Sequence, residues 1–407
     1  MKSLLLLITY GWPSATSGCG IAVASSIRQY LRYYDNVHLA AIIDSEFECA
    51  DEWTDCDFGW THVRASRPKR WLRFLLSLFS RHPAVCFQYR SKQVRRSITD
   101  IIADYQKDNY LVSVAFEGVA PSCLIDTIAR FDEAIPTCVR SHDVIGEAFS
   151  YFQEEGSFLR RLAWRIEIGK IVRLERKNLI SASRFWAITS EDADRYSRLY
   201  GHDTDGVFRV SADATRYAAV DGGNVRTVLS LGSADLLKGD GLRRFIENCW
   251  TPVHEALGDC RLVIGGRNTE PFTDEGIGVH GLGFVDSECE FLGKGCVFVN
   301  PQVKGSGIQL KSVVAMLSGR ALISTALGLE GIPGEHGKHF FRANDWKELR
   351  EYLLLLMNDR ELAIEVGRCG RALCAAHFSS KTLDGEVDPL LADFSVYNGE
   401  RATGESR

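Results

Sequence analysis

The sequence predicts an α/β protein with two successive doubly wound parallel sheets. Short apolar runs alternate with amphipathic segments of helical periodicity along the chain, a pattern typical of parallel sheets with helices on both faces. The length of 407 residues exceeds that of one ordinary core and favours two domains of about 200 residues each. An Asp-Gly-Gly turn, Asp221–Gly223, gives the two sets of strands a boundary.

The predicted strands are nine short apolar runs, each between two segments with helical periodicity. Five belong to the first half of the chain and four to the second. They are Leu4–Thr9, His38–Asp44, Leu111–Phe116, Thr137–Arg140 and Trp186–Thr189, followed by Thr227–Leu231, Arg261–Gly265, Cys296–Asn300 and Ala321–Thr325.

The helical periodicity and the breakers together predict the domain limits. A long basic helix over 159–183 would close the first domain, and helices over 346–357 and 361–377 would end the second. We therefore expect an N-terminal domain at 1–215, a C-terminal domain at 216–380, a segment at 381–397 that crosses back to the first domain, and a disordered tail at 398–407.

Composition and charge exclude several classes of protein. The chain is 45% hydrophobic and 25% charged, as in soluble globular proteins. A formal charge of −5 argues against a nucleic-acid partner. The apolar run at Leu4–Thr9 ends in Gly11-Trp12-Pro13 without a cleavage site, which favours a buried strand over a signal peptide. No run reaches the ~18 apolar residues of a membrane span, so we expect a cytoplasmic protein.

The twelve cysteines form no Cys-x-x-Cys pair. Several lie inside apolar runs, as Cys138 and Cys296 do. We therefore expect free thiols in a reducing compartment, and neither disulfides nor a metal site.

A glycine turn precedes the first predicted helix, which would begin near Ile21. Glycines such as Gly18 and Gly20 allow backbone amides to approach an anion at a helix N-terminus, but they also allow close strand–helix packing. A dinucleotide fingerprint with Asp44 as its ribose-binding acid is a further alternative. Eight residues separate Thr9 from Gly18, which disfavours that fingerprint.

In the second half, two loops that follow strands carry glycines and a lysine. Gly232 and Ser233 end one strand, and Lys238 precedes the next helix. After another strand, Gly305-Ser306-Gly307 comes one turn before Lys311. Both loops follow the carboxyl ends of strands, where open α/β sheets bind ligands. The pattern predicts a phosphate or diphosphate site, although Lys238 alone is equally typical of a solvated loop.

Polar residues also follow strands in the first half. Arg140, His142 and Asp143 come at the end of one strand, and Glu117 ends its neighbour. A histidine in that place is a candidate ligand contact.

Two further segments have structural explanations. Asp192-Ala193-Asp194 resembles a metal-binding pair, but its place at a helix start favours capping. Residues 67–82 are apolar with basic ends, which is typical either of a buried helix or of a helix that touches anionic lipid.

Taken in order, these motifs resemble the GT-B glycosyltransferases of the retaining, GT4-like kind. The resemblance covers most of the chain and is strongest over 226–380. It rests on the segments VLSLGSADLLKGDGLRRFIENCW, RLVIGG, VHGLGFVDSECEFLGKGCVFVNP, GSGIQLKSVVAMLSGRALISTALGLEGI and HFSS, with RSHDV and FWAITSEDADRY in the first half.

The resemblance implies two Rossmann-like domains that face a cleft for a nucleotide-sugar. In the second domain Lys238 and Lys311 would neutralise the donor diphosphate, with the amides of Gly305–Gly307, while Gly283 and Phe284 would meet the nucleobase. In the first domain Gly18 and Gly20 would approach a phosphate or the acceptor, and His142 would contact the transferred sugar. The implied reaction retains configuration by front-face attack and needs no metal or other cofactor.

The sequence departs from this family at named positions. Ser306 and Val314 stand where many relatives have two glutamates, and Ser233 stands where an arginine often serves the diphosphate. The predicted function is transfer of a sugar to a glycan or lipid-linked acceptor, at a peripheral contact with the inner membrane face. The alternative is a non-catalytic GT-B subunit that partners an active transferase; an epimerase or phosphorylase has less motif support.

Overall fold

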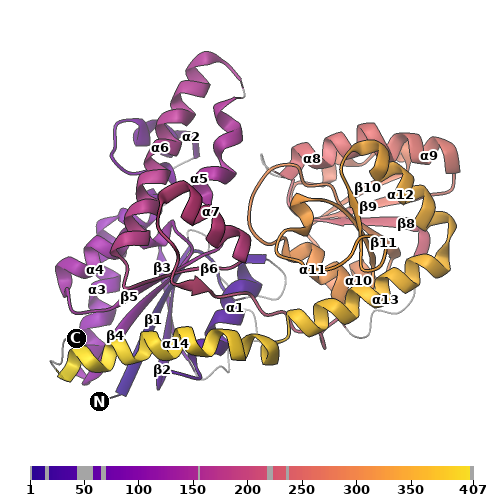
Figure 1. The fold of residues 1–407 in the computed structure, drawn as a ribbon. Helices are drawn as coiled ribbons and strands as arrows, with labels where there is room; N and C mark the ends of the chain where they lie inside the picture. The colour runs from indigo at the N-terminus through magenta and orange to yellow at the C-terminus, as the bar shows by residue number, and fades with distance from the viewer. Residues whose placement is uncertain are drawn as a thin grey trace. The chain divides into compact units, whose positions relative to one another are not determined.

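The computed structural model describes residues 2–13, 18–43, 58–65, 70–154, 156–217, 223–234 and 238–403. The chain forms two compact α/β units (Figure 1). Unit 1 comprises Met1–Val210 and Asp384–Arg407, and unit 2 comprises Ser211–Leu383.

Unit 1 is built on a seven-stranded parallel sheet of order β3-β2-β1-β4-β5-β6-β7. The central strand β1 pairs along its length with β2 and β4, from Leu4↔Asn36 and from Lys2↔Tyr110. The strands are β1 (Lys2–Thr9), β2 (Asn36–Ile43), β3 (Gly59–Arg64), β4 (Tyr110–Glu117), β5 (Thr137–Ser141), β6 (Arg184–Ala187) and β7 (Gly206–Val207).

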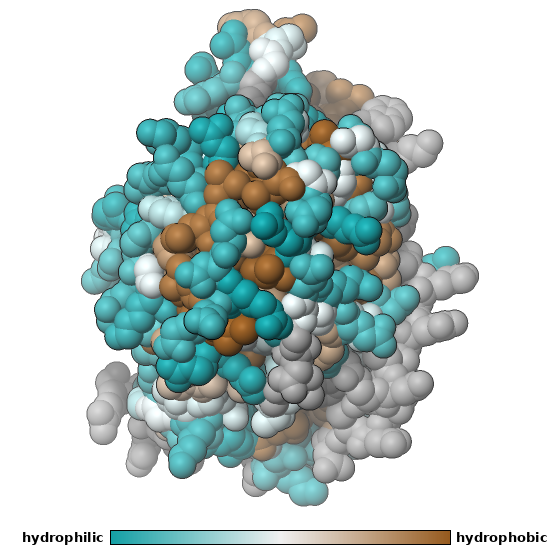
Figure 2. Space-filling view, turned by 90° about the vertical axis from the view of Figure 1, so that its right-hand side faces the viewer, coloured by the Kyte–Doolittle hydropathy of each residue, from teal (hydrophilic) through white to brown (hydrophobic). Residues whose placement is uncertain are grey.

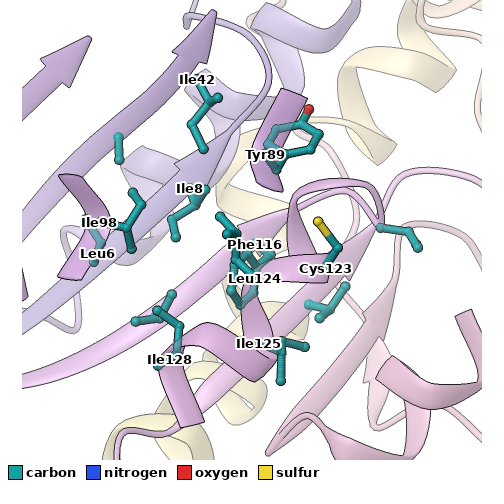
Figure 3. Packing of buried hydrophobic residues seen from close by; sticks show 14 of the residues in the cluster. Leu6, Ile8, Ile42, Tyr89, Ile98, Phe116, Cys123, Leu124, Ile125 and Ile128 are labelled. Atoms are coloured by element: carbon teal, nitrogen blue, oxygen red, sulfur yellow. The ribbon is translucent and has the colours of Figure 1, made fainter. Parts of the chain in front are cut away.

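Helices cover both faces of this sheet. Alternate residues of β1 accordingly belong to two different apolar clusters, one on each face. On one face Leu6 and Ile8 of β1 pack with Ile98, Phe116 and the segment Cys123–Ile128 (Figure 3). The helices are α1 (Gly18–Tyr30), α2 (Arg70–Leu78), η2 (Ala84–Arg90), α3 (Lys92–Lys107), η3 (Pro121–Leu124), α4 (Ile125–Phe131), α5 (Ile145–Ala148), η4 (Ser150–Gln153), α6 (Phe158–Ser181) and α7 (Ser190–Tyr200).

The last helix, α14 (Ser380–Thr403), completes the other face of unit 1. Val387, Leu391 and Phe394 are fully buried in one cluster with Leu5 and Leu7 of β1. Ion pairs from Arg184 to Asp393 and from Arg209 to Glu386 flank this contact. The predicted disordered tail at 398–407 was wrong for residues 398–403, which are helical, since Glu400-Arg401-Ala402 are good helix formers.

Unit 2 is built on a six-stranded parallel sheet of order β10-β9-β8-β11-β12-β13. Its strands are β8 (Asn224–Leu231), β9 (Arg261–Gly265), β10 (Val279–Gly283), β11 (Gly295–Asn300), β12 (Ala321–Thr325) and β13 (Phe341–Ala343). Its helices are α8 (Lys238–Phe245), η5 (Ile246–Trp250), α9 (Thr251–Leu257), η6 (Glu270–Phe272), η7 (Glu275–Ile277), α10 (Glu288–Leu292), α11 (Leu310–Leu317), η8 (Leu327–Leu329), α12 (Trp346–Asn358) and α13 (Arg360–His377).

The prediction of two parallel α/β sheets is confirmed, and all nine predicted strands are present. The strands β3, β7, β10 and β13 were missed, because they lie at sheet edges and lack a continuous apolar run. β10, for example, reads VHGLG and contains a register shift at its glycines. The strand predicted to reach Thr189 ends at Ala187, since Thr189 instead caps α7.

The nine cysteines whose side chains are described are free thiols, as predicted. Within the described residues no group of three or more His, Cys, Asp or Glu is placed to hold a metal ion.

Over the part of the chain that the structure describes, every helix is too short or too polar to span a bilayer. On the face shown in Figure 2, hydrophobic patches lie among hydrophilic residues. Such a mixture is usual, because apolar atoms supply more than half of the accessible surface of folded proteins.

Candidate functional site

Unit 1 gathers polar side chains where three adjacent strands end. Tyr10 follows β1, Glu117 ends β4, and Arg140 and His142 lie at the end of β5. The sheet order places β4 between β1 and β5, so the three strand ends are neighbours. This is the edge at which open α/β sheets bind ligands.

Glu117 and Arg140 form a fully buried ion pair. The Arg140 Nη1 atom lies 3.0 Å from Glu117 Oε2, and both side chains have 0% exposure. The guanidinium also donates to the carbonyl oxygens of Phe208 (2.9 Å), Arg209 (3.0 Å) and Ala22 (3.3 Å). Because it contacts the head of α1 and the segment after β7, Arg140 fixes two loops at the site edge.

His142 is held by contacts to both of its ring nitrogens. Nε2 lies 2.5 Å from Glu117 Oε2, and Nδ1 lies 3.2 Å from the Tyr10 hydroxyl. The side chain keeps 12% of its exposure. His142 is therefore at the surface of the site with its orientation set by a buried carboxylate, an arrangement that also fixes the tautomer of a histidine.

The same contacts keep Glu117 ionised. Burial opposes ionisation of this carboxyl, but the Arg140 guanidinium and the His142 contact outweigh it and lower its pKa below the ordinary value. The site edge thus holds one buried negative charge, paired with one buried positive charge.

The predicted glycines Gly18 and Gly20 lie in the first turn of α1, which begins at Gly18 and not near Ile21 as expected. Gly18 is exposed, whereas Gly20 is buried. Asp44, the acid of the alternative dinucleotide fingerprint, lies outside the described residues.

Unit 2 contains a cavity at the corresponding edge of its own sheet. Gly232, Ser233 and Lys311 line it with Gln302, and its remaining lining residues are Ser230, Leu231, Leu242, Ile264 and Pro301. A Cβ atom placed on Gly232 would lie 3.5 Å from Lys311 Nζ, so the ammonium lies directly over the loop backbone. Three of the predicted site residues therefore share one cavity.

Gly232, which lines this cavity, lies against Gly266 of the neighbouring loop. Gly232 has φ of 143° and Gly266 has φ of 132°, a conformation that favours glycine. A Cβ on Gly266 would lie 2.3 Å from the Gly232 carbonyl oxygen. The two loops after β8 and β9 can approach each other this closely only without a side chain at Gly266.

The loop between β11 and α11 lies beside the same cavity. Gly305 and Gly307 have φ of 129° and 73°, and a Cβ on Gly305 would lie 2.7 Å from Gln302 Nε2. The Gln302 side chain is 4% exposed, and its oxygen has no hydrogen-bond partner among the described residues. The Gln309 amide contacts the carbonyl oxygens of Ser306 (3.4 Å) and Gly307 (3.2 Å), which holds the loop against α11.

An ion pair joins this loop to α8. Lys304 Nζ lies 3.1 Å from Asp240 Oδ2, and Arg244 lies 3.3 Å from the same oxygen. Burial opposes ionisation of Asp240, but Lys304 and Arg244 lower its pKa. Lys238 is the first residue of α8, whereas the sequence placed it before the helix; its side chain lies outside the described part of the chain.

Helix α11 is buried along almost its whole length. Leu310, Val313, Val314 and Leu317, on the predicted core face, are at most 8% exposed, and Lys311 lies off this face. Val314, at 2% exposure, points into the core of unit 2.

Gly283 and Phe284 lie at the end of β10. Gly283 has φ of 72°, and a Cβ there would lie 2.5 Å from Glu270 Oε1. Phe284 is 62% exposed, although it is a large aromatic side chain. Neither residue lines the cavity that contains Lys311.

Sequence reasoning missed Tyr10 and Gln302. Tyr10 directly follows a predicted strand and Gln302 follows another by two residues, so their places at strand ends were the available signal. Asp192, by contrast, has the predicted capping role: its amide donates to Thr189 Oγ1 at 3.0 Å and its carboxylate pairs with Arg195.

Comparison with known proteins gives a family match in unit 2. Residues 225–359 match the model of the family described as Glycosyl transferases group 1. A curated protein from Klebsiella pneumoniae, described as an uncharacterised 44.6 kDa protein in the cps region, is 38% identical over 61 residues. That alignment spans 15% of this chain and 16% of the Klebsiella protein.

Solved structures resemble the chain over nearly its whole length. Sucrose-phosphate synthase from Thermosynechococcus elongatus has a TM-score of 0.69 at 14% identity, covering 97% of this chain and 100% of its own. HepE from Anabaena, in complex with UDP and glucose, has a TM-score of 0.65 at 13% identity, covering 96% and 100%. The chain therefore has the GT-B fold, and its residues 225–359 match the model of the Glycosyl transferases group 1 family.

Proposed function

We propose that the protein transfers a sugar from a nucleotide-sugar to a glycan or lipid-linked acceptor, with retention of configuration and without a metal ion or other cofactor. The reaction breaks the bond between the sugar C1 and the diphosphate and forms one between C1 and an acceptor oxygen. The proton of the acceptor hydroxyl passes to the departing phosphate oxygen. The main task of the protein is therefore to stabilise negative charge on the leaving diphosphate.

The observation that carries this proposal is the position of Lys311 over Gly232. The Lys311 ammonium, in the first turn of α11, lies over the glycine turn at Gly232 in one cavity, and a cation at the head of a helix favours an anion there. Solved HepE structures contain UDP or UDP-glucose, which supports a nucleoside diphosphate as the ligand. Lys238, at the first position of α8, would add a second cation.

The remaining donor contacts follow from the same loops. Gln302 Oε1 is buried and has no hydrogen-bond partner in the described part of the chain, so a sugar or ribose hydroxyl would satisfy it. We expect Phe284, exposed beside Gly283, to stack on the nucleobase, since stacking on an aromatic ring suits any base.

In unit 1, we propose that His142 contacts the transferred sugar. Glu117 and Tyr10 hold its ring in one orientation, which is the kind of support that a positioned contact requires. We expect Gly18 and Gly20, in the first turn of α1, to approach a phosphate or an acceptor group.

We also propose that the protein works in the cytoplasm in peripheral contact with a membrane surface. Support comes from α2, which was predicted either as a buried helix or as a lipid contact. Leu75 and Leu76 of this helix are each 46% exposed, and Phe79 just after it is 89% exposed.

A second candidate is a non-catalytic subunit that partners an active transferase. Val314 favours it, because an apolar side chain buried in the core cannot hold a ribose as the glutamate of many relatives would. The nucleotide-binding experiment separates the two candidates.

The first test is a thermal-shift panel with UDP, GDP and dTDP. A diphosphate at ~100 times its dissociation constant should stabilise the protein by about 2.7 kcal/mol, which corresponds to a rise of about 5–10 °C in the Tm of a unit of this size. The subunit candidate predicts no rise with any nucleotide.

The second test replaces the cations. Lys238→Ala and Lys311→Ala should each lower kcat/KM by about 100-fold and remove the shift, while Lys347→Ala on the exposed side of α12 should change neither. Normal turnover by both variants would refute the diphosphate site.

A further inference from the structure

A second cavity lies in unit 1 and is formed by residues that the proposed transfer reaction does not use. It lies between the turn after α2, the segment η3–α4, and the second half of α6. Its charged lining residues are Arg81, Lys170, Arg173, Lys177 and Asp126, and its other lining residues are His82, Pro83, Ser122, Cys123, Ile125, Leu174 and Asn178.

The cavity has more positive than negative charge. Lys177 pairs with Asp126, and Lys170 lies 3.5 Å from Glu167 Oε2. Arg81 and Arg173 line the same cavity, and neither forms an ion pair with any residue that the structure describes. Two guanidinium groups therefore remain available, and guanidinium is the side-chain group that best matches a phosphate.

The other polar side chains that line the cavity, His82, Ser122 and Asn178, carry no negative charge. Burial, with the positive charges of Arg90 and Lys177, lowers the pKa of His82, so the imidazole is neutral near pH 7. Ser122 and Asn178 are buried at the base of the cavity and bond to each other. An anion that enters would meet two charged donors and no uncompensated carboxylate in the described lining.

The face of α6 that leads to this cavity changes from apolar to basic along the helix. Leu162, Ile166, Lys170, Arg173 and Lys177 follow at intervals of three or four residues, so they share one face. Leu162 and Ile166 are 44% and 43% exposed. The first turn adds Phe158 and Leu159, which are 69% and 75% exposed.

The exposed apolar residues belong to well-packed helices. Figure 1 shows α2 and α6 side by side above the sheet of unit 1. Their facing sides are joined by the rings of Phe74 and Trp164, with centroids 4.9 Å apart, and by Ser77 Oγ, which donates to Glu167 at 2.8 Å. Phe79, two residues before Arg81, is 89% exposed on the outer side. The apolar surface is thus formed by a rigid helix pair.

We propose that this cavity binds the phosphate of an anionic phospholipid, with Phe79, Phe158 and Leu159 inserted among its acyl chains. Charge complementarity selects this occupant, because the basic residues of the cavity suit an anionic headgroup. The exposed apolar residues belong to the same two segments: Phe79 lies two residues before Arg81, and Phe158 and Leu159 lie in the first turn of α6. The inference rests on the membrane contact proposed above, and gives that contact a specific headgroup site.

The experiment measures binding of the full chain to vesicles of phosphatidylcholine, with and without phosphatidylglycerol, by co-sedimentation. The wild type should bind only the anionic vesicles. Arg81→Ala/Arg173→Ala should weaken this binding about 30-fold, since each basic residue at such a surface contributes about 1 kcal/mol. Both arginines are exposed, so the variant should fold.

A matched control separates the effect of the cavity arginines on vesicle binding from the effect of net positive charge. Lys92→Ala/Arg96→Ala, on exposed positions of α3, also removes two positive charges. This variant should reduce vesicle binding less than about threefold. An equal loss in both variants, or no loss with Arg81→Ala/Arg173→Ala, would overturn the headgroup site.

A second pair of variants tests the exposed apolar residues of the proposed membrane contact. Phe158→Ser/Leu159→Ser should weaken vesicle binding, whereas Leu355→Ser/Ile364→Ser, at exposed positions of unit 2, should not. If the Phe158→Ser/Leu159→Ser variant binds as the wild type does, and glycerol phosphate alone saturates the cavity, the ligand is a soluble phosphate and the proposal fails. The nucleotide shift is recorded for each variant, so a failure of the transferase proposal is seen independently.

Discussion

Replacement of Glu117 by glutamine should destabilise unit 1 severely, because it leaves Arg140 as an unpaired charge at 0% exposure. Removal of one partner from a buried ion pair usually costs about 3–5 kcal/mol. The three carbonyl oxygens around the guanidinium remain, but they carry no full negative charge. In a unit of this size the loss corresponds to a fall of about 10 °C in Tm.

The assay is scanning calorimetry of the full chain, with Glu255→Gln as the control. Glu255 is an exposed carboxylate of α9 in unit 2, and its replacement should change stability by less than about 0.5 kcal/mol. The double variant Glu117→Gln/Arg140→Met should lose less than the sum of the two single variants, since no uncompensated charge remains.

Acid titration provides a second readout of the same pair. The pKa of Glu117 is lowered in the folded protein, so its contribution to stability is present above the unfolded pKa of about 4.3 and is lost as pH falls through the folded value. Glu117→Gln should therefore show a smaller loss of stability below about pH 4 than the wild type. A destabilisation under about 1 kcal/mol at pH 7, or additive single and double variants, would refute the reasoning.

Two further predictions concern a buried acid and a glycine. Burial raises the pKa of Glu175 to about 7, although Tyr200 and two backbone amides donate to it, so folding favours the protonated form. The free energy of unfolding should therefore decline by about 3 kcal/mol as pH rises from about 4 to 7. Glu175→Gln should flatten that part of a Tm–pH profile, and an unchanged slope would contradict this. Gly266→Ala would place a Cβ 2.3 Å from the Gly232 carbonyl oxygen, so we expect this variant to lose the nucleotide-induced thermal shift. Gly258→Ala, where no atom lies within 4 Å of the added Cβ, should keep the shift. Equal shifts in both variants would show that the contact between Gly266 and Gly232 tolerates a side chain.

The sequence predicted the sheets well because a buried parallel strand has a local signature. β1, β9 and β12 are continuous apolar runs, and such runs in a helical context specify a parallel core. β7 and β13 have two and three residues, so their pairing depends on the sheet already formed. Propensity within so short a segment cannot reveal it.

The candidate site was predictable only in part. Glycines and a lysine after a strand identified the loops around Lys311, because that chemistry is local in sequence. Tyr10, Glu117 and His142 are far apart in the sequence and meet only through the order of three strands. Arg140 was identified by its place at a strand end, but its full burial had no local signal, since an arginine there is usually exposed.

Helix α14 makes unit 1 depend on a segment that is synthesised after unit 2. Its residues Val387, Leu391 and Phe394 are fully buried against β1, whose own residues leave the ribosome some 380 positions earlier. One face of the unit 1 sheet, which α1 also covers, therefore lacks its α14 contacts while the whole of unit 2 is made. Closure of so long a loop is slow relative to local folding, so Leu5 and Leu7 of a nascent chain would lack their contacts with α14 until that helix docks. Cells that interrupt translation before α14 should accumulate a chaperone-bound unit 1.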